Sequence, residues 1–268
     1  MSIKKILLPV DFPNASVQVV HQAATLARRF HSEIVLLHVV NPFTETVEWA
    51  QEQLDQSLRP ELEGITVRRV LVQDEPIHAI MQAAQVQKAD LIMMPPRGYT
   101  FDQFLLGSLA AKVIHGIDCP IWTSAHVEES QAREFAISNV LCSVDFSSRS
   151  HKTVSWAAQM ASEFGGRLTL VHVTASVELW GPGGDYINPK WNEALVGDAS
   201  QHLAELQRDM GIKTDVFIGS GDVPRVLSQA AMQTKADLLV TECYPYGGNL
   251  RIYGYAIICA VPIPVLSV

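Results

Sequence analysis

The chain has 268 residues, and 48% of them are hydrophobic, so it can form one large domain or two ordinary domains with apolar cores. Its formal charge of −8 comes from 28 acidic against 20 basic side chains, with no long basic run to offset it. This balance argues against nucleic acid as a partner, because binding to a phosphate backbone relies on clustered Lys and Arg.

The cysteines and the N-terminus indicate a cytoplasmic protein. Cys119, Cys142, Cys243 and Cys259 form none of the close pairs typical of zinc or redox motifs, so we interpret them as thiols in a reducing compartment. The first apolar run is interrupted by Asp11, too early for a signal peptide or a membrane span. We therefore predict no membrane partner and no metal.

In chain order, the first half alternates short apolar runs with amphipathic stretches. Near-continuous apolar runs of this kind are typical of strands buried on both faces of a parallel sheet. Strands are predicted over residues 3–10, 34–40, 65–72, 91–94 and 120–124. Helices are predicted after the first strand up to Phe30, within residues 43–63, from Pro76 to about Lys88, and over 107–115.

The second half repeats this pattern. Adding 134 to the numbering of residues 6–39 gives thirteen identities without a gap, so the chain is an internal duplication. The polar segment 126–133 is the predicted linker, and the predicted domains are residues 1–126 and 134–268. Each is expected to be an open, doubly wound, Rossmann-like parallel sheet with five strands and four helices.

Several candidate ligand-binding residues lie at predicted strand ends. In a doubly wound sheet, ligands bind beyond the carboxyl ends of the strands, where the strand order reverses. Backbone N–H groups at the helix that begins at Gly107 could also face a phosphate. The alternative is a crossover loop with a turn at Gly98 and a cap at Ser108. The candidate ligand-binding residues are Asp11, Val39, Met94, Arg97, Gly98, Gly107 and Ser108.

Four motifs make the chain resemble a tandem universal stress protein, with two such domains in one chain. They are a first strand ending in Val-Asp (ILLPVDF, VLCSVDF), a second strand ending in His-Val (LLHV, LVHV), a repeated Lys-Ala-Asp-Leu, and GSLAAKVIHGIDCPIW. The resemblance implies ATP as a ligand, with Asp11 and Val39 facing the adenine. It also implies that Gly98 faces the ribose or phosphates, and that Gly107 and Ser108 face the phosphate chain.

The chain departs from the family's phosphate loop, which is written Gly, two residues, Gly, nine residues, Gly-Ser or Gly-Thr. Pro95 replaces the first glycine, and only eight residues separate Gly98 from Gly107. In the second half, Glu242, Pro245 and Tyr255 replace Pro95, Gly98 and Ser108. We therefore expect at most one ATP pocket, weak and in the first half, with a degenerate second pocket.

Other assignments stay open. Asp11 and Asp145 could equally cap the helices that follow them, whereas His38 and His172 are interpreted as core groups and left out of the site. No nucleophile, carboxylate pair or metal cluster stands out, so no catalytic residue is assigned. A non-enzymatic stress protein is favoured over two alternatives, a slow ATPase that uses the first pocket and a ligand-free interaction scaffold.

The short strands at 120–124 and 262–268 are expected to join the two halves as an intramolecular pseudo-dimer. Each strand would otherwise expose an apolar edge, which natural sheets avoid. Similar proteins dimerise through this strand, and duplication would make the contact internal. A homodimer of the whole chain is left open.

Overall fold

The structure, a computed structural model, describes residues 2–12, 17–95, 113, 116–124, 135–175, 178–181, 184–187, 189–242 and 251–268. The chain divides into two units. Unit 1 comprises Met1–Phe135, Cys243–Tyr255 and Pro264–Val268, and unit 2 comprises Ala136–Glu242 and Ala256–Ile263. The domain boundaries at 1–126 and 134–268 stay a prediction.

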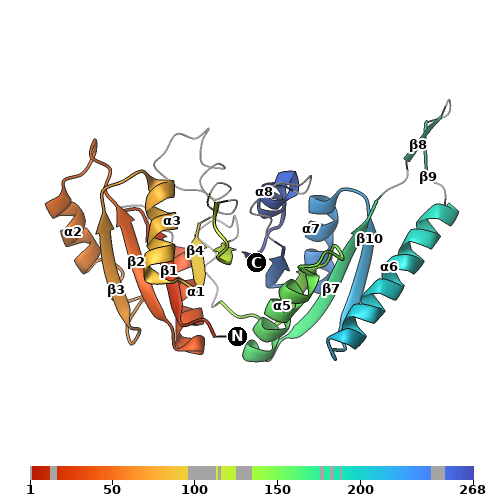
Figure 1. The fold of residues 1–268 in the computed structure, drawn as a ribbon, viewed down its shortest axis with the longest axis horizontal. Coiled ribbons are helices and arrows are strands. Elements are labelled where there is room, and N and C mark those ends of the chain that lie inside the picture. The colour runs from red at the N-terminus through yellow and green to blue at the C-terminus, as the bar shows by residue number, and fades with distance from the viewer. Residues whose placement is uncertain are drawn as a thin grey trace. The chain divides into compact units, whose positions relative to one another are not determined.

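Unit 1 has the strand order β12-β5-β4-β1-β2-β3. Figure 1 labels the last four of these strands, β4, β1, β2 and β3. Of the helix predicted over 107–115, only Val113 lies within the described residues, and it is helical. The elements of unit 1 are β1 (Lys5–Val10), α1 (Val17–Phe30), β2 (Glu33–Val39), α2 (Val47–Gln56), β3 (Val67–Val72), α3 (Pro76–Gln87), β4 (Leu91–Met94), β5 (Ile121–Thr123) and, from the far end of the chain, β12 (Val265–Ser267).

Strand β1 is buried on both faces, as the sequence predicted. Ile6, Leu7 and Leu8 follow one another and are each 0% exposed, and successive side chains of a strand point to opposite faces. The strand pairs in parallel with β2 and with β4. The predicted parallel α/β sheet is therefore confirmed for unit 1.

Unit 2 repeats the frame with the strand order β10-β7-β6-β11. Its sheet pairings are parallel throughout these four strands among the registers that the structure describes. The elements are β6 (Asn139–Ser143), α5 (Ser150–Phe164), β7 (Arg167–Thr174), β8 (Glu178–Gly181), β9 (Gly184–Ile187), α6 (Pro189–Asp209), β10 (Asp215–Ser220), α7 (Val223–Thr234), β11 (Leu238–Thr241) and α8 (Arg251–Ala260), which enters unit 2 at Ala256.

An insertion explains why the sequence repeat loses register. Strands β2 and β7 begin at Glu33 and Arg167, an offset of 134, whereas β4 and β11 cover 91–94 and 238–241, an offset of 147. The difference, 147 minus 134, is 13 residues. The antiparallel hairpin of β8 and β9, which was not predicted, and the longer helix α6 both lie in this interval.

The repeated Lys-Ala-Asp-Leu motif has a structural role in both units. Asp90 accepts hydrogen bonds from the backbone N–H groups of Lys4 and Lys5, at 2.8 and 2.9 Å. Asp237 accepts the equivalent bonds from Ser138 and Asn139, at 2.8 and 2.9 Å. Each aspartate therefore ties the start of the fourth strand of its repeat to the start of the first strand.

The C-terminal strand β12 completes the sheet of unit 1. It pairs antiparallel with β5, with Leu266 opposite Trp122, so the predicted pairing of these two strands is confirmed. Leu266 and Trp122 are both 0% exposed, and the indole Nε1 of Trp122 donates to Gln22 Oε1 at 2.8 Å. Strand β12 therefore covers the β5 edge that would otherwise be unpaired.

Replacing Leu266 with Ala should destabilise unit 1 by about 2–5 kcal/mol, because a fully buried leucine leaves a cavity when it is truncated. Urea unfolding followed by tryptophan fluorescence would measure the change. The control is Val86→Ala on α3, where the valine is 69% exposed and a change within about 0.5 kcal/mol is expected. Equal effects of the two substitutions would contradict this account of β12.

Candidate functional site

The candidate site of unit 1 lies at the carboxyl ends of three adjacent parallel strands. Strand β1 stands between β4 and β2, so the strand order reverses between β1 and β4. Asp11 follows β1, Val39 ends β2 and Met94 ends β4 (Figure 1). The fold thus brings these three candidates to the same edge of one sheet, which we call the unit 1 crevice.

The four loop candidates of unit 1 cannot be placed in this frame. Arg97, Gly98, Gly107 and Ser108 lie outside the described residues, so their role in phosphate binding stays a prediction. Pro95, which directly follows β4, is described and half-buried. The Met94 carbonyl accepts a hydrogen bond from the Ser124 N–H at 3.3 Å, which ties the end of β4 to the residue after β5.

The capping role considered for the two aspartates can be compared with the structure at Asp145. Helix α1 is described from Val17, and residues 13–16, between Asp11 and this helix, lie outside the described residues, so capping by Asp11 stays a prediction. Helix α5 begins at Ser150, and its N-cap position is held by Arg149 without a side-chain hydrogen bond. Asp145 instead accepts from the Ser147 N–H at 2.9 Å, which organises the turn after β6. The capping alternative is therefore wrong for Asp145.

His38 is a satisfied buried group, as the sequence indicated, but its second partner was not foreseen. The ring is 1% exposed and lies against Phe12 with 5.1 Å between ring centroids. Nδ1 donates to the Val10 carbonyl at 3.0 Å, and Nε2 contacts Glu45 Oε2 at 2.8 Å. Since Glu45 comes from the segment between β2 and α2, the pair holds this segment over the crevice edge. No local sequence pattern pointed to Glu45.

The second repeat keeps one half of this arrangement. His172 Nδ1 donates to the Val144 carbonyl at 2.7 Å, as His38 does to Val10. The ring of Phe146 lies 4.3 Å from that of His172 and 5.2 Å from that of His202 on α6. Phe146 has a φ of 61°, a left-handed conformation that is strained for a residue with a side chain. The turn after β6 therefore differs locally from its counterpart in unit 1.

A second carboxylate occupies the corresponding edge of unit 2, which we call the unit 2 crevice. Glu242 directly follows β11, at the position that Pro95 holds in unit 1. Its carboxylate oxygens accept hydrogen bonds from the hydroxyls of Ser147, at 2.6 Å, and Ser150, at 2.9 Å. Ser150 also donates to Asp145 at 3.4 Å. Two carboxylates and two serine hydroxyls therefore converge where β6 and β11 end.

Cys142 lies beneath this cluster, on β6. It is 0% exposed, and burial, with a smaller contribution from the negative charge of Glu242, raises the pKa of its thiol well above the ordinary value. A raised pKa keeps the thiol protonated at neutral pH, and a protonated thiol is a poor nucleophile. Cys142 is thus a core group of unit 2.

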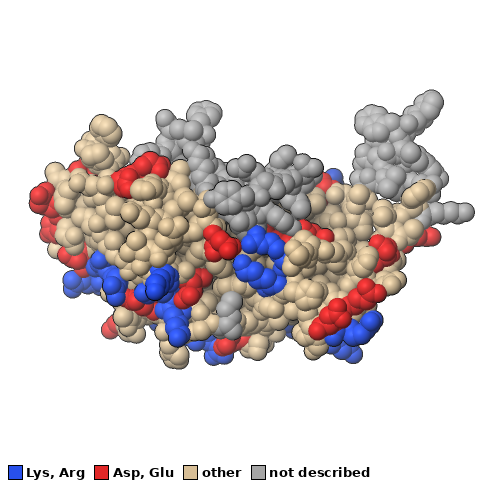
Figure 2. Space-filling view, viewed as in Figure 1, with Lys and Arg blue, Asp and Glu red and all other residues tan. Residues whose placement is uncertain are grey.

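The face of the molecule drawn in Figure 2 has no continuous basic area among its described residues, since blue and red side chains are interspersed there. Across the described residues, no group of three or more His, Cys, Asp or Glu could hold a metal ion. None of the helices that the structure describes combines the length and apolarity needed to cross a bilayer.

Comparison with known proteins identifies the repeat. The sequence profile described as "Universal stress protein family" matches residues 2–124 and again residues 136–243. A universal stress protein of Methanocaldococcus jannaschii is 29% identical over 135 residues, which cover 44% of this chain and 79% of that protein.

Two solved structures resemble the whole chain in fold. A universal stress protein from Archaeoglobus fulgidus has a TM-score of 0.73 at 19% identity, over 99% of this chain and 96% of that one. A protein of unknown function from Pseudomonas aeruginosa also has a TM-score of 0.73, at 16% identity, over 99% and 92%. The family profile matching twice confirms the tandem resemblance that the motifs suggested.

The burial of Cys142 predicts a difference in reactivity between two thiols. At pH 8, iodoacetamide should leave Cys142 unmodified in the folded protein, because its raised pKa and its burial deny the reagent a thiolate. Cys259, exposed on α8, should be alkylated in the same sample. Peptide mass spectrometry reads both sites, and labelling of Cys142 as fast as Cys259 would refute the account. Both thiols should react after unfolding in guanidinium chloride.

Proposed function

The chain belongs to the universal stress protein family, and on that premise we propose that it is a non-enzymatic, cytoplasmic stress protein with at most one working nucleotide pocket, in unit 1. The ligand proposed for that pocket is ATP, bound weakly. The candidate contacts are Asp11 and Val39 for the adenine, and Met94 with the loop residues Arg97, Gly98, Gly107 and Ser108 for the ribose and phosphates.

The single observation that carries the proposal is the difference between the two crevices. In unit 2, Asp145 and Glu242 are both hydrogen-bonded to Ser150, so two negative charges lie within one small cluster. Like charges repel, and a triphosphate brought to that cluster would meet both carboxylates. In unit 1, Pro95 stands where unit 2 has Glu242, so that charge is missing. Unit 1 is therefore the better candidate for an anionic ligand.

The hydrogen bonds at the end of β1 support the proposal that the adenine part of the unit 1 pocket is held in a fixed shape. His38 and Glu45 join the carbonyl at the end of β1 to the segment that follows β2. Asp11 follows that carbonyl directly, so the contact limits how the peptide before Asp11 can rotate. A preorganised edge lowers the ordering cost of binding a rigid base.

The alternatives make different measurable predictions. A slow ATPase would release phosphate from ATP, and Gly107→Tyr, which places a bulky ring in the phosphate loop, would abolish the release. A ligand-free scaffold would neither carry nor bind a nucleotide. Native mass spectrometry of freshly purified protein, which detects co-purified nucleotide, is the first experiment to perform.

We expect calorimetry to give one ATP site per chain. Asp11→Ala should weaken binding roughly tenfold or more, because one hydrogen bond to a charged group is worth about 1.5–3 kcal/mol. Asp145→Ala is the matched control in the second repeat and should leave the ATP affinity unchanged. Two equivalent sites, or equal losses in the two variants, would contradict the assignment of the pocket to unit 1.

Pro95→Gly should tighten ATP binding by roughly tenfold to a hundredfold, because glycine restores a backbone donor and frees φ at the start of the loop. The gain shrinks to the extent that glycine also loosens the unbound loop. The measurement is titration of both proteins with ATP at identical salt and Mg²⁺. Unchanged or weaker ATP binding by Pro95→Gly would show that the proline does not limit the affinity of the pocket. Absence of ATP binding in both the wild type and the variant would favour the ligand-free scaffold.

A further inference from the structure

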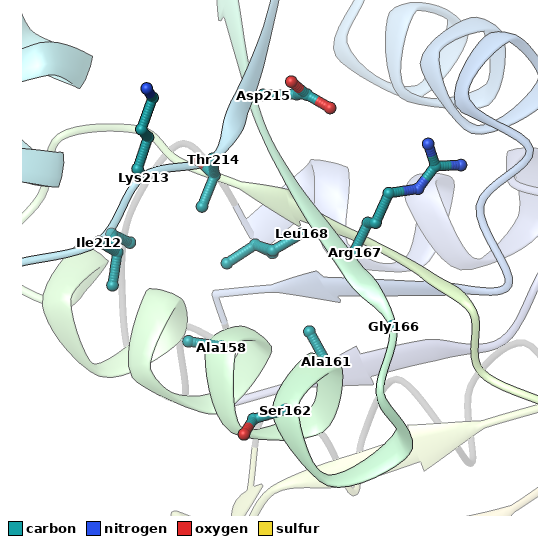
Figure 3. Close-up of a pocket in the computed structure, with 10 residues that line it drawn as sticks. All are labelled: Ala158, Ala161, Ser162, Gly166, Arg167, Leu168, Ile212, Lys213, Thr214 and Asp215. Atoms are coloured by element: carbon teal, nitrogen blue, oxygen red, sulfur yellow. The ribbon is translucent and has the colours of Figure 1, made fainter.

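Unit 2 has a groove at the sheet edge opposite its crevice (Figure 3). The groove has a volume of about 540 Å³ and lies where β7 and β10 begin, beside the C-terminal part of α5. Ala158 and Ala161 from α5, Leu168 from β7 and Ile212 from the segment before β10 point their side chains into it. Its floor is therefore apolar.

One charged side chain, the exposed Lys213, stands at the rim of this floor. Arg167 and Asp215 also line the groove, but successive side chains of a strand point to opposite faces, so both point to the face of the sheet opposite Leu168 (Figure 3). The Arg167 Nε donates to Asn139 Oδ1 at 3.1 Å, which holds the guanidinium near the start of β6. Lys213 therefore gives the rim of the groove one positive charge, in a chain whose formal charge is −8.

The first repeat closes the corresponding space with its own side chain. Arg28 on α1, at the position of Ser162 on α5 when 134 is added, donates from Nη2 to the Glu61 carbonyl at 3.1 Å and the Glu63 carbonyl at 3.3 Å. These carbonyls belong to the segment that leads into β3, so the arginine spans the space between α1 and that segment. Ser162 is too short to do the same in unit 2.

The apolar side chains next to these positions are more exposed in unit 2, which has Ser162, than in unit 1, which has Arg28. Ala24 and Ile34 in unit 1 are 1% and 0% exposed. Their counterparts in unit 2 at the same offset of 134, Ala158 and Leu168, are only half-buried. The two repeats thus share the apolar wall, which lines a groove in unit 2, whereas Ala24 and Ile34 are covered in unit 1. Apolar surface that stays open in a concave site is stabilised when a ligand covers it.

We propose that this groove binds a small organic anion with an apolar body, such as an alkyl or aryl carboxylate. The apolar floor would take the body of the ligand, and Lys213 at the rim would take its charge. A volume of about 540 Å³ lies within the range of small-molecule sites, which is roughly 300–1,000 Å³. The site is separate from the unit 2 crevice, because it lies at the amino-terminal ends of the strands of that unit.

The binding test uses the full chain and a fluorescent aryl sulfonate, 8-anilinonaphthalene-1-sulfonate, as the probe. We expect saturable binding at one site and displacement of the probe by decanoate below its micelle concentration. Decanol, which has the same chain length without the charge, should displace the probe at least tenfold less well. Absence of saturable binding, or equal displacement by decanol, would overturn the proposal.

A plug variant locates the site. Ser162→Met places a neutral side chain, about as long as the aliphatic part of Arg28, at an exposed helical position where methionine is well tolerated. Probe affinity should fall at least tenfold. Ser200→Met makes the same change at an exposed position of α6 that does not line the groove, and should keep the wild-type affinity. Retained binding in Ser162→Met, or an equal loss in Ser200→Met, would contradict the location.

A charge variant tests the anion. Lys213→Ala removes an exposed rim cation and should weaken the binding of decanoate roughly threefold or more at low salt. The dependence of the affinity on salt should also become flatter than in the wild type. Far-ultraviolet circular dichroism and the unfolding midpoint should match the wild type in each variant. Lys213→Ala with unchanged affinity and unchanged salt dependence would show that charge does not select the ligand.

Discussion

Parallel pairing of β1 with β2 on one side and β4 on the other is the constraint on which the candidate site depends. Because parallel strands end at the same edge, this pairing gathers residues that are far apart in sequence, Asp11, Val39 and Met94, around one reversal of strand order. Burial of β1 on both faces makes the pairing strong, and Asp90 ties β4 to the start of β1. The binding edge is therefore a consequence of how the core is built.

The two repeats share their helices and strands but differ in the residues at both ends of the sheet strands. The helices α3 and α7 and the strands β4 and β11 keep one offset, and the donation from a histidine Nδ1 to the first-strand carbonyl occurs in both units. At the carboxyl edge, Glu242 in place of Pro95 adds a carboxylate to unit 2. At the opposite edge, Ser162 in place of Arg28 leaves the groove open. Edge residues can diverge in this way because they contribute little to the core.

The elements that the sequence predicted correctly are those whose sequence patterns lie within a few residues. Strand β4 and the proline start of α3 were predicted where they occur, because an apolar run and a proline at the first helical turn act within a few residues. The hairpin of β8 and β9 was missed, since its short strands lie in a connection that the first repeat does not have. The roles of Arg97, Gly98, Gly107 and Ser108 rest on the family resemblance, outside the described residues.

By itself, the sequence determined the α/β class, the tandem duplication, the family and the pairing of the last strand with β5, because hydrophobic period and repeated motifs are properties of the chain. The tertiary structure alone decided which distant side chains meet. Glu45 reaches His38, Ser147 and Ser150 hold Glu242, and Arg28 closes a space that Ser162 leaves open. Such contacts depend on the packing of helices and connections against the sheet, and no periodicity in the sequence encodes which side chain spans a given gap.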